Sequence, residues 1–365
     1  MTNGKLSGVL FHGDGARLVE TLECVTSVLL AIVFAHAIGA TNISWAAFAG
    51  YMVMRGHIAD TLTRGALRIA GTGTGGLAAL LVTAQLTPHW PIAALALMIV
   101  GTGSLYAAIT ARRAYGWLFF GLTFAMVVFD KIEHPDIALS AFVTTRILET
   151  LAGTVACATV SLVSSITLRR KWPANRAAAA QGAAWHPNAL RHAAQGGVAL
   201  AVLTALSGLF RVPAPAQAAV TIMAVMLVPV AGIGSSGFRA VSVRVLQRFI
   251  GCIAGAILAA CFLVLARGSP VVLVIGTVVG VFIGRQLENG GHAYRYFGMQ
   301  FALAILTALV PDTYANAAIA PALERLSGIL IGMAVLEPVL IGWHVLRPSR
   351  VPTDPSPPSE GPDEV

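Results

Sequence analysis

The chain has 365 residues, of which 56% are hydrophobic and only 11% charged, and its mean hydropathy is +0.78. Soluble domains carry about 25% charged residues, so this composition excludes a soluble globular protein. The formal net charge of +8 comes from basic residues scattered at the ends of apolar segments, which indicates membrane orientation rather than nucleic-acid binding. We therefore expect an all-α integral membrane protein in contact with the lipid bilayer.

The apolar runs predict about twelve transmembrane helices, because each run approaches the ~20 residues that a helix needs to cross a bilayer. The expected spans lie near 17–38, 43–55, 65–86, 90–110, 114–129 and 138–168, and then near 189–210, 214–234, 245–266, 270–285, 293–310 and 318–346. The chain then divides into a first membrane unit at 1–168, a cytoplasmic linker at 169–188, a second membrane unit at 189–347 and a tail at 348–365. The tail is rich in proline and acidic residues and is expected to be disordered.

Loops that contain clusters of basic residues alternate along the chain with loops that contain none. Arg112 and Arg113 precede the fifth span, and a cluster at 169–171 follows the sixth, whereas the loop at 130–136 is net acidic. Because cytoplasmic loops are enriched in lysine and arginine, both termini are expected in the cytoplasm.

The two halves contain similar motifs. RIAGTGTG at 68–75 recurs 180 positions later as RFIGCIAG at 248–255, and RILETLAG at 146–153 recurs as RLSGILIG at 325–332. Six spans per half is an even number, so both halves enter the membrane from the same side. We therefore expect two parallel six-helix repeats related by a pseudo-two-fold axis along the membrane normal.

Gly71, Gly73 and Gly76 have the G-x-G-x-x-G spacing of a dinucleotide-binding turn. In the second copy, however, Ile253 occupies the place of Gly73, and no strand precedes either copy. The spacing that survives is G-x-x-x-G, which allows two membrane helices to approach closely. We interpret this stretch as a packed membrane helix.

Four arginines occur at matched positions within or near apolar spans: Arg68, Arg146, Arg248 and Arg325. A charge at the centre of a span costs about 2.5–3.5 kcal/mol on insertion scales, so such a residue usually faces a cavity or a partner. Guanidinium groups bind carboxylates bidentately, which predicts a cationic pathway for an organic anion. Two alternatives stay open: Arg68 and Arg248 could extend to the lipid headgroups, and Arg146 and Arg325 could form structural ion pairs, Arg146 with Glu149.

Two carboxyls and two aromatic residues complete the candidate site. Glu149, one turn beyond Arg146, and Glu337, followed by Pro338, are candidates for carrying a coupling proton. Trp45 could line an outer mouth, and Tyr115 could lie at a cytoplasmic entrance and stack on an aromatic ring. AYGWLF at 114–119 is expected to correspond to AYRYFG at 293–298, which pairs Tyr115 with Tyr294.

The distribution of histidine and cysteine argues against metal or enzymatic chemistry. The nine histidines show no ligand spacing, the four cysteines lie in apolar runs without a C-x-x-C motif, and no local catalytic triad motif occurs. We therefore expect no metal, no cofactor and no enzymatic activity.

These motifs resemble a known family. The segment at 42–76, with Trp45, Arg68 and Gly71, is similar to the N-terminal signature of the fusaric acid resistance and aromatic acid exporter family, and TRILETLAG at 145–153 resembles its sixth-span signature. The resemblance implies an efflux protein of the bacterial inner membrane that exports aromatic or other weak organic acids, driven by the proton gradient. It also implies a periplasmic adaptor protein as partner, although this sequence lacks the large cytoplasmic domain that commonly follows each membrane half.

Two other functions remain open at this point. One is a passive organic-anion channel, since the aluminium-activated malate transporters resemble this family distantly. The other is a membrane scaffold that transports nothing. A homo-oligomer is compatible with all three functions.

Overall fold

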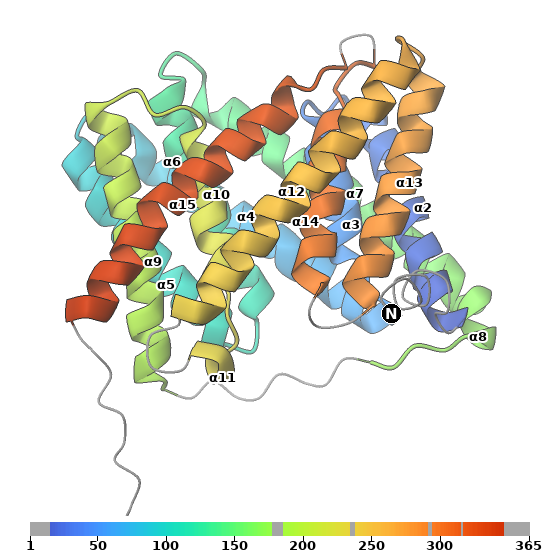
Figure 1. The fold of residues 1–365 in the computed structure, drawn as a ribbon, viewed down its shortest axis with the longest axis horizontal. Helices are drawn as coiled ribbons and strands as arrows, with labels where there is room; N and C mark the ends of the chain where they lie inside the picture. The colour runs from blue at the N-terminus through green and yellow to red at the C-terminus, as the bar shows by residue number, and fades with distance from the viewer. Residues whose placement is uncertain (1–14, 177–184, 234–237, 291–293, 315–316, 347–365) are drawn as a thin grey trace, which may run out of the picture.

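The computed structural model describes residues 15–176, 185–233, 238–290, 294–314 and 317–346, and every regular element within them is helical (Figure 1). The predicted tail at 348–365 lies outside the described residues, and the linker at 169–188 is described only in part.

The first half contains six helices followed by a single-turn helix. They are α2 (Gly15–Ala37), α3 (Ile43–Val53), α4 (Ile58–Leu86), α5 (Trp90–Thr110), α6 (Ala114–Glu133), α7 (Leu139–Ile166) and the short α8 (Leu168–Lys171). The second half also begins with a long helix and then a short one. It contains α9 (Pro187–Leu209), α10 (Pro215–Val225), the short α11 (Val230–Ile233), α12 (Phe238–Ala266), α13 (Pro270–Asn289), α14 (Arg295–Leu309) and α15 (Ala320–Leu346).

Within the described residues, nine helices are long and apolar enough to cross a membrane. The class of a multi-pass α-helical membrane protein is therefore confirmed. The other three expected spans, α3, α10 and α14, have 11, 11 and 15 residues. Their length alone does not support twelve complete crossings.

Several boundaries differ from the sequence prediction. Helix α4 begins at Ile58 rather than near 65, and Asp60 lies in its first turn. The expected span at 214–234 is divided into α10 and α11, with non-helical backbone before Pro229, because a residue preceding proline disfavours the helical conformation. Helix α15, by contrast, continues through Pro338.

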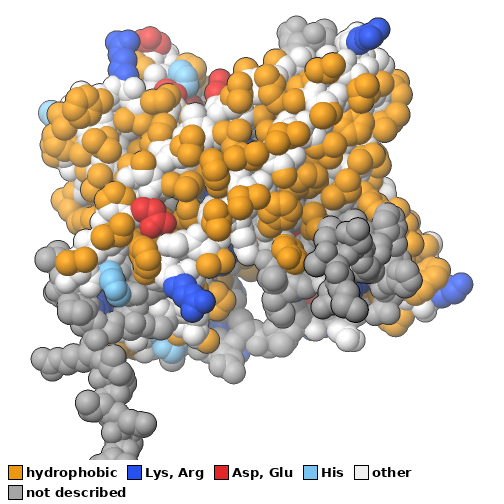
Figure 2. All heavy atoms as spheres, in the orientation of Figure 1, with side chains coloured by type: hydrophobic (Ala, Val, Ile, Leu, Met, Phe, Trp, Pro, Cys, Tyr) orange, Lys and Arg blue, Asp and Glu red, His pale blue; other side chains and the backbone are white. Residues whose placement is uncertain are grey.

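The outer surface is apolar over a broad band. Figure 2 shows a face covered mainly by hydrophobic side chains, with charged side chains gathered mainly towards its upper and lower edges. Leu81, Val264, Leu265 and Val271 are among the large apolar residues that are more than half exposed. In water such a surface would be unfavourable, and it matches the lipid contact predicted from composition.

The two halves of the chain are interleaved. Helix α5 packs against α9, and α13 packs against α2, so helices from both halves lie in each side of the molecule (Figure 1). At the first of these contacts Gly101 lies against Gly197 and Leu200, and small residues of this kind let helix backbones approach closely. The core is therefore built jointly by residues that are far apart in sequence.

The glycine-rich stretch at 68–76 is part of α4, and no strand precedes it among the described residues. A Cβ on Gly71 or Gly75 would collide with the backbone of α6, whereas a Cβ on Gly73 would meet nothing within 4 Å. Helices α12 and α14 repeat the arrangement, because a Cβ on Gly251 would lie 2.8 Å from the carbonyl oxygen of Phe297. The glycines thus pack helices, as G-x-x-x-G predicts.

A buried ionic cluster joins α13 to the first half. Arg285 is 0% exposed, and its guanidinium donates to Glu20 of α2 at 2.7 Å, to Glu288 at 3.1 Å and to the carbonyl oxygen of Met54 at 3.0 Å. Tyr51 of α3 donates to Glu288 at 2.8 Å. Sequence reasoning missed this cluster, because the span was expected to end at 285.

Candidate anion-binding site

Three cavities inside the helix assembly share the indole of Trp45 in their walls. The wide cavity has a volume of about 650 Å³, the narrow cavity about 40 Å³ and the shared cavity, which is lined by both halves of the chain, about 110 Å³. Arg146 lines the wide and narrow cavities, and Arg68 lines the narrow and shared cavities. The narrow cavity therefore shares one arginine of its wall with each of the other two cavities.

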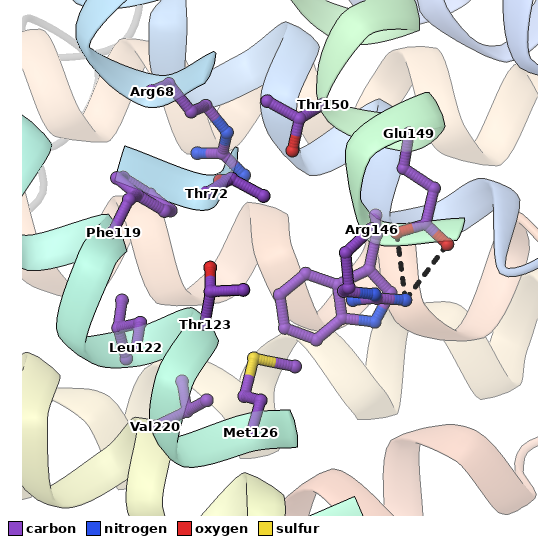
Figure 3. Close-up of a pocket in the computed structure, with 11 residues that line it drawn as sticks. Arg68, Thr72, Phe119, Leu122, Thr123, Met126, Arg146, Glu149, Thr150 and Val220 are labelled. Carbon is purple, nitrogen blue, oxygen red and sulfur yellow. Dashed lines mark hydrogen bonds and ion pairs between the residues drawn. The ribbon is translucent and has the colours of Figure 1, made fainter. Parts of the chain in front are cut away.

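The narrow cavity lies between α4, α6 and α7. In Figure 3, Arg68 and Arg146 stand on different sides of it, with Thr72, Thr123 and Thr150 around the space between them. Arg146 Nη2 is 2.9 Å from each carboxylate oxygen of Glu149, and the guanidinium carbon lies 4.4 Å from the centre of the Trp45 ring. The predicted pairing of Arg146 with Glu149 is thus present.

Arg68 is held by aromatic side chains. Its guanidinium carbon lies 4.0 Å from the centre of the Phe119 ring, and its Nη1 donates to the Tyr115 hydroxyl at 3.3 Å. Arg68 is only 3% exposed, and Arg248 only 2%. Neither side chain extends to a headgroup region, so the alternative of lipid-facing arginines is wrong.

The shared cavity brings together residues of α12, α14 and α15 with residues of the first half. Arg248 Nη1 donates to Gln300 Oε1 at 2.9 Å and to the Tyr296 hydroxyl at 3.4 Å. Arg325 Nη2 donates to the same Gln300 oxygen at 3.3 Å. The first half contributes Phe48, Met52 and Phe119, among others, to the opposite wall.

The charge in the shared cavity is unbalanced. Arg68, Arg244, Arg248 and Arg325 line it, and none of its described lining residues is acidic. The Nε atoms of all four arginines and Nη2 of Arg248 are buried without a hydrogen-bond partner in the described part of the chain. Because a buried cation without a counter-ion is costly, the arrangement favours an anion.

The wide cavity has the opposite charge character. Asp130, Glu133 and Glu324 line it, together with Arg146. Helices α3 and α10 begin beside it, each after a residue in the left-handed conformation, Asn42 with φ 56° and Ala214 with φ 47°. Short helices that begin inside a membrane protein are typical of transporter binding sites.

The contacts of the arginines change which residue of the second half corresponds to Tyr115. Arg64 and Arg68 both contact Tyr115, and Arg244 and Arg248 both contact Tyr296. Tyr115 thus corresponds in its contacts to Tyr296 and not to Tyr294, which is 62% exposed. The error arose because the visible AY dipeptides were aligned, whereas the helix contacts place the match two residues later.

The other predicted residues lie in different places. Glu149 lines the narrow cavity, and Tyr115 supports Arg68 without lining any of the three cavities. Glu337 is half-buried, accepts a hydrogen bond from Ser242 at 3.3 Å and does not line these cavities either. Sequence reasoning missed Gln300, although an amide within the apolar run 296–306 was a visible signal.

A multi-pass helical fold with buried cations around internal cavities defines the chain as a membrane protein with a polar interior, the class to which transporters belong. Residues 30–160 and 204–336 match the family described as Fusaric acid resistance protein-like. The chain therefore belongs to this family of membrane transport and resistance proteins, which are not typically enzymes. Comparison with curated proteins and with solved structures gave no match.

Proposed function

We propose that this protein is a secondary transporter that exports organic carboxylic acids, aromatic ones in particular, across the bacterial inner membrane. The observation that carries the proposal is the shared cavity, where Arg68, Arg248 and Arg325 meet and no described lining residue is acidic. A carboxylate would supply the missing negative charge and accept hydrogen bonds from guanidinium groups. The family description, which names resistance to an aromatic carboxylic acid, supports the same substrate class.

The aromatic residues around the arginines support an aromatic cargo. Trp45, Phe48 and Phe119 lie in the walls of the shared cavity, and each has an arginine near the face of its ring. A flat aromatic anion can contact ring faces and guanidinium groups together. Trp45 lies in the wall of all three cavities, which suits a residue that an anion passes on its way.

Glu149 is the better supported of the two candidates for carrying the coupling proton. It lines the narrow cavity and pairs with Arg146, so protonation of Glu149 would release Arg146 for an anion. Glu337 stays a prediction without a cavity contact among the described residues. Gly328 occupies the place in the second half that matches Glu149, so Glu149 has no acidic counterpart there.

The matched family regions at 30–160 and 204–336 support a duplicated architecture. We propose two parallel repeats, each with six helices that include the short α3 and α10 and the 15-residue α14, and with both termini in the cytoplasm. The periplasmic adaptor and a homo-oligomer also remain proposals.

The test is uptake of benzoate by liposomes in which the cytoplasmic face of the purified protein points outward, with and without an imposed proton gradient. A proton-coupled exporter accumulates benzoate against its concentration gradient, and a protonophore abolishes the accumulation. Glu149→Gln is expected to remove gradient-driven accumulation while exchange of benzoate across the membrane persists. Glu337→Gln, measured alongside, shows whether the second carboxyl contributes.

The other outcomes identify other functions. Flux that follows only the benzoate gradient, exceeds the flux into protein-free liposomes and is unchanged in Glu149→Gln would show a passive channel. Flux equal to that of protein-free liposomes under every gradient would contradict the proposal and favour the scaffold.

A further inference from the structure

Most polar groups of the shared cavity come from the second half of the chain, and Arg68 comes from the first. Arg248 of α12 and Arg325 of α15 both donate to Oε1 of Gln300 on α14, at 2.9 and 3.3 Å. Gln300 itself is 1% exposed. A single neutral oxygen thus lies at the point that both guanidinium groups reach.

The matching position in the first half has a different side chain. Gly75 of α4 packs on the backbone oxygen of Phe120, and Gly255 of α12 packs on that of Phe301 in the same way. The residue before each contact is Phe119 in α6 and Gln300 in α14. At these matching positions, Arg68 lies over the phenyl ring of Phe119, whereas Arg248 donates a hydrogen bond to the amide of Gln300. The cavity has one aromatic side and one polar side.

One amide oxygen does not satisfy this pair of arginines. Nε and Nη2 of Arg248 and Nε of Arg325 are buried without a partner among the described residues. A carboxylate has two oxygens and about four acceptor positions, and it can bind a guanidinium group bidentately. It could therefore reach N–H groups that Gln300 leaves unpaired.

We propose that the carboxylate of the transported anion binds Arg248 and Arg325 in the position that Gln300 Oε1 occupies, so that Gln300 is a displaceable placeholder that positions the two arginines. This inference rests on the proposed function. The apolar body of the anion then lies against Phe48, Met52 and Phe119 on the other side of the cavity. The arginine pair, positioned by Gln300, then orients the carboxylate end of the anion towards the second half.

Two substitutions test this role through benzoate binding to the purified full-length protein in detergent, measured by calorimetry and by thermal unfolding. Gln300→Glu supplies a permanent carboxylate of the same shape. It is expected to raise the unfolding temperature without benzoate and to weaken benzoate binding at least about tenfold, a loss of about 1.4 kcal/mol. Gln300→Met keeps the length but removes the oxygen. It is expected to lower the unfolding temperature, to bind benzoate at least as tightly as the wild type and to show a larger benzoate-induced shift.

Gln85→Glu is the matched control, because Gln85 is exposed near the end of α4 and lines none of the three cavities. It is expected to leave benzoate affinity within about twofold of the wild type, since an exposed charge is screened. This control separates a local effect at the arginine pair from a general effect of added negative charge.

Each other outcome overturns one proposal or the other. Benzoate affinity in Gln300→Glu equal to that of the wild type would show that the carboxylate binds elsewhere. Equal loss in Gln300→Met and Gln300→Glu would make Gln300 a structural support, and failure of Gln300→Glu to fold would contradict the need for negative charge at this point. If the wild type itself does not bind benzoate, the proposed function fails, and the unfolding temperatures of the two variants still test the placeholder.

Discussion

At the scale of single residues, the two halves differ in how their matched arginines are compensated. Arg146 has Glu149 at 2.9 Å, whereas Arg325 has only neutral hydrogen-bond partners among the described residues, with Gly328 where an acid would match Glu149. Removing one member of a buried ion pair leaves an uncompensated charge, which costs more than the pair itself contributes. The consequences of substitution should therefore differ between the halves.

Arg146→Gln is expected to destabilise the protein by about 3–5 kcal/mol, because it leaves the buried Glu149 carboxylate unpaired. The double variant Arg146→Gln with Glu149→Gln should recover a large part of this loss, since both charges are then absent. Thermal and denaturant unfolding in detergent measure the difference.

Arg325→Gln is the control for these two variants, because no acidic partner of Arg325 is present among the described residues. Its unfolding temperature should fall less than that of Arg146→Gln. A double variant no more stable than Arg146→Gln alone would show that Glu149 does not depend on its arginine.

At the scale of elements, the contact between α4 and α6 depends on two glycines. Gly71 and Gly75 face the backbone of α6, and Gly73, between them, faces open space. A methyl group at either packed position must push two helices apart, because a backbone carbonyl cannot rotate away as a flexible side chain can.

Gly75→Ala is expected to destabilise the protein by about 1–3 kcal/mol through overpacking. Gly73→Ala, two residues away in the same helix, should be neutral or stabilising by up to about 1 kcal/mol, since alanine favours a helix over glycine. Unfolding temperatures of the two purified variants make the comparison. Equal effects would mean that the glycines act through helix propensity and not through packing.

The contact between α13 and the first half depends instead on charge. Arg285→Met removes the donor shared by Glu20 and Glu288, two carboxylates that lie in α2 and α13. We expect a loss of about 3–5 kcal/mol, because Glu20 loses its cation and Glu288 keeps only Arg55, at 3.7 Å.

Arg295→Met provides the control for this prediction, because Arg295 is exposed at the start of α14. It should change stability by less than about 0.5 kcal/mol. If Arg285→Met unfolded at the wild-type temperature, the cluster would not contribute to joining the halves.

At the scale of the whole molecule, the core is formed by exchange of helices between the two halves. α5 lies on α9 and α13 on α2, so neither half buries its own packing surfaces alone. Asp312, in the connection after α14, also accepts a hydrogen bond from the backbone N–H of Ile43 at the start of α3, at 2.8 Å. Separation of the halves would expose these surfaces together.

Cutting the chain between Arg176 and Trp185 should therefore leave the halves associated. With a protease site inserted there, both fragments are expected to migrate as one particle in mild detergent and to separate only when the protein is denatured. Separate particles after cleavage in mild detergent would contradict an interleaved core.

The sequence by itself determined the membrane class, the order of the helices, the packed glycines and the buried arginines, because apolar runs, small-residue spacing and isolated charges are local properties of the chain. The sequence did not determine which tyrosine of the second half corresponds to Tyr115. The AY dipeptides suggested Tyr294, whereas the contacts with α12 identify Tyr296. Only the tertiary structure decided that Arg68, Arg248 and Arg325 share a cavity, that Gln300 joins two of them, and that Arg285 meets Glu20, 265 positions away. A local pattern shows that a charge must find a partner within the membrane, but the partner is chosen by how distant helices pack.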